Sequence, residues 1–196
     1  MSNFFSRFPV AVWPLVLVLF VLLLCWAGTP VVQALRFDHS AIELGEYWRL
    51  ISAHFVHLGW AHGLLNSGGL LLVAWMQPTG KAWRWLAFYM LSSLCISIAL
   101  FFQGEVVTYV GASGVLHGLL IMAAFYSQWL ELWRRVLIIL LISVKLVWEQ
   151  SPWYADTGVG GMIGGYVVVD AHFLGGLAGL LVILVVFTKS RIKPLA

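Results

Sequence analysis

Apolar residues fill six long stretches of the chain, and short segments that carry most of the charges separate them. The stretches run approximately over 10–28, 57–76, 83–102, 113–130, 134–150 and 166–188. A helix needs about 20 mostly apolar residues to cross a bilayer, and runs of about 18 or more are candidates. The pattern predicts an all-α membrane protein, with six transmembrane helices in one bundle and a single domain over 1–196.

Composition agrees with this pattern. The chain is 62% apolar and 10% charged, whereas about 25% of the residues in a soluble domain are charged. The net charge of +3 does not indicate nucleic-acid binding, because the basic residues lie at the ends of apolar stretches, as in membrane proteins. We therefore expect membrane lipids and no nucleic acid as partners. Cys25 and Cys95 lie inside apolar stretches and are interpreted as small apolar residues.

Basic residues are distributed unequally between the two sides of the predicted bundle. If the N-terminus is cytoplasmic, only Arg36 and Arg49 lie on the outer side. The basic residues on the inner side are Arg7, Lys81, Arg84, Arg134, Arg135, Lys189, Arg191 and Lys193. This asymmetry predicts that both termini are cytoplasmic.

Two polar residues inside apolar stretches are candidates for chemistry. Ser113 begins the fourth stretch, and His172 lies about six residues into the sixth. Polar and ionisable residues at such positions are functional-site hypotheses by default. In the predicted topology the second, fourth and sixth stretches enter from the outer side. His62 and Asn66, in the first turns of the second stretch, therefore share the depth of Ser113 and His172.

Glycines predict which helices approach closely. Pairs spaced i, i+4 stand beside each candidate residue, and they are Gly114 with Gly118 and Gly175 with Gly179. Small residues at this spacing let membrane helices pack tightly. Close packing would bring the Ser113 hydroxyl within hydrogen-bond reach of His172, which is the nucleophile–base pair of acyl transfer.

The residues around Ser113 could stabilise an oxyanion. A serine at a helix N-terminus lies beside free backbone N–H groups, and His62 and Asn66 share one helix face. No aspartate stands in position to orient His172, because Asp170 points elsewhere. We therefore expect a Ser–His dyad, with no metal and no cofactor.

Four motifs in order resemble the rhomboid intramembrane serine proteases. They are Glu46-Tyr47-Trp48-Arg49, His57-x4-His62-x3-Asn66, Gly111-Ala112-Ser113-Gly114 and Ala171-His172-x2-Gly175-x3-Gly179. The resemblance implies a six-helix rhomboid core, in which Ser113 is the nucleophile and His172 the general base. It implies an oxyanion hole of His62, Asn66 and the Ser113 N–H group, and a structural role for Trp48 and Arg49. It also implies transmembrane protein substrates that enter laterally beside the fifth span.

One position departs from the usual rhomboid pattern. His117 stands four residues after Ser113, where rhomboids often have an aromatic residue that stacks on the catalytic histidine. With the minimal six-span length, this chain resembles the rhombosortase subgroup. That resemblance implies processing of proteins with a C-terminal Gly-Gly sorting segment, at a bacterial inner membrane. A rhomboid protease of general transmembrane substrates is the alternative.

Other interpretations stay open on the sequence alone. Ser113 could be only a helix cap, and His62 with Asn66 only an interhelical hydrogen-bonding pair. We expect His57 to brace the first loop, His54 to be solvated at the interface, and Glu46 with Arg49 to form a structural ion pair. A metal- or haem-binding protein could use His54, His57, His62, His117 and His172, although no His-Glu-x-x-His motif is present.

Overall fold

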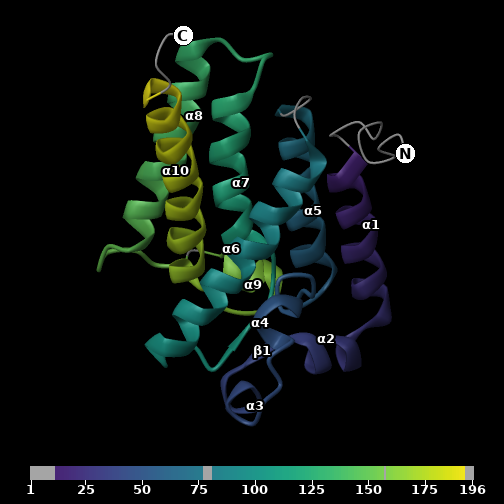
Figure 1. Ribbon diagram of the computed structural model, residues 1–196. Coiled ribbons are helices and arrows are strands. Elements are labelled where there is room, and N and C mark those ends of the chain that lie inside the picture. The colour runs from purple at the N-terminus through teal and green to yellow at the C-terminus, as the bar shows by residue number, and fades with distance from the viewer. Residues whose placement is uncertain (1–11, 77–80, 157, 193–196) are drawn as a thin grey trace.

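Each of the six apolar stretches forms a long helix in the computed structural model, which describes residues 12–76, 81–156 and 158–192. The long helices are α1 (Val12–Ala27), α5 (Trp60–Met76), α6 (Ala82–Gln103), α7 (Ser113–Tyr126), α8 (Leu132–Glu149) and α10 (Val169–Ile192). Short elements join them, namely α2 (Thr29–Leu35), β1 (Phe37–Asp38), α3 (His39–Glu43), α4 (Arg49–Ser52), β2 (Thr108–Tyr109) and α9 (Val159–Ile163). The long helices form one bundle, with α2, α3 and α4 gathered at one end (Figure 1).

Several helix boundaries differ by a few residues from the predicted ones. Helix α7 ends at Tyr126 rather than near residue 130, because Ser127 adopts an extended backbone conformation. Helix α10 begins at Val169 rather than at 166, after the left-handed Gly164 has ended α9. His172 is therefore in the first turn of α10 and not six residues into a helix.

In the part of the chain that the structure describes, fewer helices than the six predicted are both long enough and apolar enough to cross a membrane. Among the described residues, α6 and the 169–186 part of α10 are long and apolar enough to cross a membrane. The pair α1 and α2, bent by 115°, could supply a third span. Helices α5 and α7 have 17 and 14 residues, and α8 carries two arginines, Lys145 and Glu149. The count of six spans therefore stays a prediction.

Large apolar side chains cover the outside of the bundle. Helix α8 exposes a row of them, comprising Val136, Leu137, Leu140, Leu141, Val144 and Val147. Helix α1 does the same with Leu15, Val16, Leu19, Phe20, Leu23 and Trp26. Continuous apolar surfaces of this kind are rare on soluble monomers. The surface suggests an integral membrane protein.

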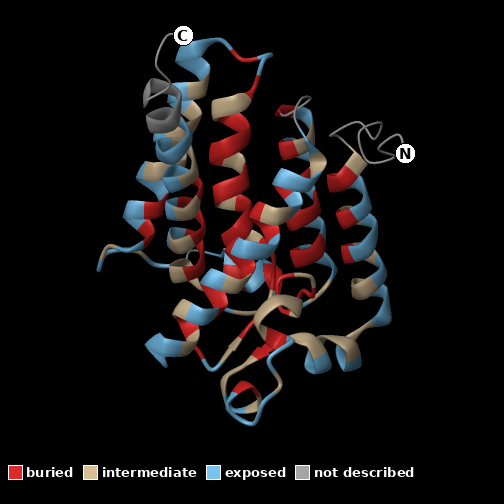
Figure 2. Ribbon diagram, viewed as in Figure 1, coloured by how far each residue is buried: buried red, intermediate tan, exposed pale blue. Residues whose placement is uncertain are grey.

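Helix α7 lies at the centre and is buried along most of its length (Figure 2). Glycines bring its backbone against that of α10. A Cβ atom added at Gly175 would overlap the Gly114 carbonyl, and one at Gly179 would lie 2.6 Å from the Gly118 carbonyl oxygen. One at Gly114 would lie 2.7 Å from the Ala171 carbonyl oxygen. The predicted close packing of these two helices is confirmed.

The long segment between α1 and α5 is tied together by Arg49. Its buried guanidinium donates to Glu46 Oε2 at 2.6 Å and to the carbonyl oxygens of Gln33 and Arg36, both at 2.9 Å. The exposed Trp48 donates from Nε1 to the Ala34 carbonyl at 3.3 Å. The expected Glu46–Arg49 ion pair is therefore confirmed, and both residues of the Trp48–Arg49 pair brace this segment.

Strands β1 and β2 pair antiparallel, with Phe37 opposite Tyr109 and Asp38 opposite Thr108. The pairing attaches the long segment to the loop that leads into α7. The expectation that His54 is solvated is wrong, since its ring is fully buried against Tyr109. His54 Nε2 instead lies 2.9 Å from Ser97 Oγ, so the ring connects the long segment between α1 and α5 to α6.

We predict that Gly175→Ala will destabilise the protein, because its methyl group would force two backbones apart. Overpacking of this kind typically costs about 1–3 kcal/mol, which thermal unfolding in detergent would measure. Gly68→Ala is the matched control, since nothing lies within 4 Å of a Cβ atom there. An unfolding temperature equal to that of the unmodified protein for Gly175→Ala would contradict the proposed backbone contact.

Burial of His54 predicts a loss of stability in acid. Burial lowers the pKa of His54 from 6.5 to about 3, so between these values the unfolded chain binds a proton that the folded protein does not. Stability should therefore fall as the pH decreases below 6.5, by up to about 1.4 kcal/mol per pH unit from this group. In unfolding titrations from pH 7.5 to 4.5, His54→Gln should have a shallower pH slope.

Ser97→Ala is the control for the His54 prediction, because it removes the hydrogen bond but no titrating group. It should lower stability by a similar amount at each pH. An unchanged slope in His54→Gln would show that acid sensitivity arises elsewhere.

Candidate active site

Ser113 is the first residue of α7 and follows a sharply turned glycine. Gly111 has a φ of +109°, which side-chain-bearing residues rarely adopt, and a Cβ atom there would lie 2.6 Å from His62 Nε2. The Gly111 N–H group donates to the Ala53 carbonyl at 2.9 Å, and its own carbonyl accepts from the Tyr109 hydroxyl at 2.8 Å. Gly111 therefore turns the chain into α7 and leaves room for the His62 ring.

The structure brings Ser113 and His172 together across the α7–α10 contact. Ser113 Oγ lies 2.9 Å from His172 Nε2, and His172 is 6% exposed. The glycine contacts described above set this distance, because they hold the two helix backbones against each other. The pair has the spacing that a nucleophile and its base need for proton transfer.

The sequence analysis missed a third residue, Glu149, at the end of α8. Its Oε2 and Oε1 atoms lie 3.1 and 3.3 Å from His172 Nδ1. The expected two-residue arrangement is therefore incomplete, because a carboxylate does reach His172. Asp170 does not, and it accepts a hydrogen bond from Gln103 instead. The signal for Glu149 was topological, since the fifth stretch ends on the side where the sixth begins.

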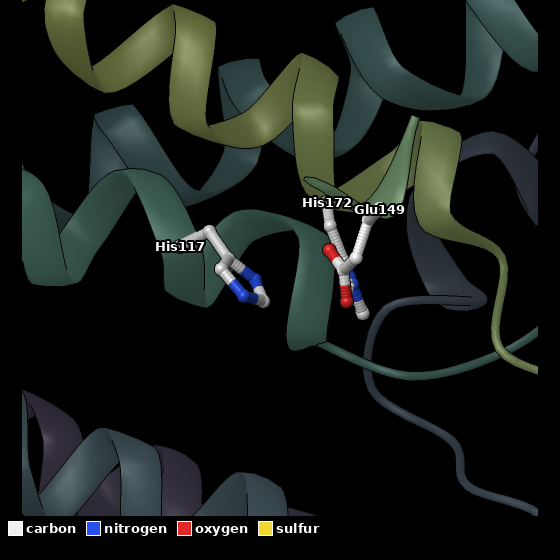
Figure 3. Close-up of side chains that lie close together, drawn as sticks. All are labelled: His117, Glu149 and His172. Carbon is white, nitrogen blue, oxygen red and sulfur yellow. Dashed lines mark hydrogen bonds and ion pairs between the residues drawn. The ribbon is translucent and has the colours of Figure 1, made fainter. Parts of the chain in front are cut away.

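Lys145 and His117 complete the surroundings of Glu149. Lys145 Nζ lies 2.6 Å from Glu149 Oε1 and 3.1 Å from His117 Nε2. His117 Nδ1 lies 2.7 Å from the Ser113 carbonyl oxygen, and not against the hydroxyl. The His117 ring packs on that of His172, with centroids 4.3 Å apart and an interplanar angle of 32°. Figure 3 shows His117, His172 and Glu149 converging from three helices.

These three side chains could also be viewed as metal ligands. One ligand atom from each of His117, Glu149 and His172 lies within 4.8 Å of the other two. However, the Lys145 ammonium group already contacts two of the three residues. His54 is bonded to Ser97 instead. The proposed five-histidine set therefore does not assemble as one group.

His62 and Asn66 project from the first turns of α5 and are buried. Asn66 Nδ2 donates to the His62 carbonyl at 3.0 Å. Among the described side chains, His62 Nδ1 and Asn66 Oδ1 have no hydrogen-bond partner. The buried His57 ring packs edge-to-face on His62, with centroids 4.8 Å apart. Neither of its ring nitrogens has a hydrogen-bond partner among the described residues, so a role in bracing the first loop stays a prediction.

A cavity of about 480 Å³ connects these residues. Its polar lining includes His62, Asn66, Ser113, His117, Lys145, Glu149 and His172. Apolar side chains supply much of the remainder, among them Leu58, Leu65, Leu116, Leu120, Ile163 and Val168. The cavity could hold a segment of apolar peptide against Ser113.

Comparison with known proteins identifies the family of this chain. Residues 44–189 match the Rhomboid domain family. RHOMBOID-like protein 5 of Arabidopsis thaliana is 29% identical over 148 residues, which cover 72% of this chain and 45% of that protein. The chain thus spans about half the length of this relative. Rhomboid proteins are generally intramembrane serine proteases. Because the matched region includes most of the chain, the protein belongs to the rhomboid family.

Proposed function

We propose that this protein is an intramembrane serine endopeptidase, with Ser113 as nucleophile and His172 as general base. The observation that carries the proposal is the 2.9 Å contact between Ser113 Oγ and His172 Nε2. The contact lies at a helix N-terminus and faces a largely apolar cavity. This arrangement supports attack on a peptide bond within or near the membrane.

The reaction follows from these positions. As Ser113 Oγ attacks the peptide carbonyl carbon, His172 Nε2 removes the hydroxyl proton and a tetrahedral oxyanion forms. His172 then gives that proton to the leaving amine nitrogen, and an acyl-enzyme remains. A water molecule, deprotonated by His172, attacks the ester, and the proton returns to Ser113 as the carboxyl product leaves.

The oxyanion would lie close to His62, Asn66 and the Ser113 N–H group. An amide nitrogen carries two hydrogens, so Asn66 can donate one to the His62 carbonyl and the other to a substrate oxygen. His62 lines the same cavity. The N-terminal N–H groups of a helix have no intrahelical acceptors, and those of α7 add donors at the same place.

The substrate would be a membrane-anchored protein. The histidine at position 117, where rhomboids often have an aromatic residue, is the basis for proposing rhombosortase-type substrates, which carry a C-terminal Gly-Gly sorting segment. General transmembrane substrates remain the second candidate. We place the protein in a bacterial inner membrane as part of the same proposal, and the charge asymmetry supports an orientation with both termini in the cytoplasm. Consistent with that topology, α1 begins and α10 ends at the same end of the bundle (Figure 1).

We predict that Ser113→Ala and His172→Ala will each abolish cleavage of membrane reporters. Two single-span reporters would be reconstituted with the purified protein, one ending in a Gly-Gly sorting segment and one without it. Cleavage of both reporters at equal rates would favour a protease of general transmembrane substrates. Cleavage of the Gly-Gly reporter alone would favour a rhombosortase-type enzyme. Substantial cleavage by either alanine variant would rule out the Ser113–His172 mechanism.

A chelator control accompanies this experiment. Activity should survive EDTA and phenanthroline, because proton transfer between serine and histidine needs no ion. Loss of activity with either chelator and its rescue by zinc would favour the metal interpretation of the His117–Glu149–His172 cluster.

We predict that His62→Ala and Asn66→Ala will each lower kcat by about 10- to 1,000-fold, with a smaller effect on KM. Donors aimed at an oxyanion act mainly in the transition state, where losing one commonly costs about 10²–10³ in rate. Steady-state cleavage of the preferred reporter would measure both constants. Rates equal to those of the unmodified protein in both variants would assign these residues a packing role only.

A further inference from the structure

Glu149 occupies a position that packing alone does not favour for a carboxylate. It is the last residue of α8 and is 7% exposed. The C-terminal end of a helix carries partial negative charge, which disfavours an anion there. Burial of an ion adds a further cost unless the ion is paired and hydrogen-bonded. The contacts that Glu149 makes must therefore offset both costs.

Two contacts do so, and they differ in kind. Lys145, one turn earlier on α8, brings its ammonium group to 2.6 Å from Oε1 and balances the charge. The second partner is His172 Nδ1, 3.1 Å from Oε2 and on a different helix. The first contact lies within α8, whereas the second fixes the carboxylate against the base proposed for catalysis.

The partners assign the protons on both histidines. A carbonyl oxygen only accepts and an ammonium group only donates. His117 Nδ1 therefore donates to Ser113, and its Nε2 accepts from Lys145. An ionised Glu149 likewise requires His172 to donate from Nδ1, which leaves Nε2 free to accept the Ser113 hydroxyl proton. This is the form of His172 that can act as a base.

The contacts also close into a ring that begins and ends at Ser113. From the Ser113 carbonyl they pass through His117 and Lys145 to Glu149, and from there through His172 to the Ser113 hydroxyl. The ring joins α7, α8 and α10. Each member fixes the orientation of the next, so removing one member should change the hydrogen bonding of the Ser113 hydroxyl.

We infer that Glu149 is a positioning residue that holds His172 in its base form, and that Lys145 and His117 hold Glu149 in turn. This inference rests on the proposed function of Ser113 and His172. The site thus works with a Ser113–His172–Glu149 triad, although Glu149 does not contact substrate. An ion pair that only stabilised α8 would not determine which nitrogen of His172 carries the proton.

Glu149→Gln provides the sharpest test because Lys145 constrains the new amide. The ammonium group only donates, so the glutamine carbonyl would turn to Lys145 and the amide NH₂ group toward His172 Nδ1. Nδ1 would then have to accept, and the ring proton would move to Nε2, where it prevents acceptance from Ser113. Replacing a triad carboxylate by its amide can cost about 10⁴ in kcat through the wrong tautomer.

We therefore expect Glu149→Gln to lower kcat by about 10²–10⁴ with KM nearly unchanged, and Glu149→Asp to recover part of the loss. The double variant Lys145→Met with Glu149→Gln should exceed Glu149→Gln in kcat, since the carbonyl is then free to face Nδ1. Glu131→Gln is the matched control. It lies at the other end of α8, is paired with Arg134 and should leave kcat unchanged.

Nitrogen-15 NMR of histidine-labelled protein gives a readout that is independent of cleavage. His172, assigned by its loss in His172→Ala, should be protonated at Nδ1 in the unmodified protein and at Nε2 in Glu149→Gln. Unmodified kcat together with Nδ1 protonation in folded Glu149→Gln would overturn the inference. Cleavage that persists in Ser113→Ala would instead overturn the proposed function, and the tautomer measurement would still report on Glu149.

Discussion

The direct backbone contact between α7 and α10 is the constraint on which the site depends. Gly114 and Gly118 on one helix meet Gly175 and Gly179 on the other, and no larger residue fits at these positions. Tight packing replaces the hydrophobic effect as the attraction between helices in a membrane. Because Ser113 and His172 are each adjacent to this contact, a separation of the two helices would break their 2.9 Å contact.

A third helix, α8, brings charged side chains to the contact between α7 and α10. Helix α8 is apolar on its outer face but ends in Lys145 and the buried Glu149, which meet His117 and His172. Lys145 is 48% exposed in its side chain, whereas Glu149 is 6% exposed. The Lys145 side chain also lines the cavity, whereas the carboxylate depends on its protein partners. The contact between Glu149 and His172 couples the position of α8 to the orientation of the His172 ring.

Much of this arrangement could be predicted from the sequence, for identifiable physical reasons. Long apolar stretches give the helices, and the glycine spacing gives the α7–α10 contact, because both are local properties of the chain. Glu149 was missed because its contact depends on the direction of a side chain 23 residues from His172. His54 was expected at the surface because nothing nearby in sequence shows that Ser97, on α6, receives its ring. The number of membrane spans also depends on helix length and on charged residues, such as those on α8.

Covalent labelling with mass spectrometry tests the central claim most directly. A fluorophosphonate should form one adduct in the reconstituted protein, and peptide mapping should locate it on Ser113. Labelling should disappear in His172→Ala, because the serine hydroxyl then has no base. An adduct on a different residue, or a folded protein that cleaves the reporter but takes up no label, would contradict the assignment of Ser113 as the nucleophile.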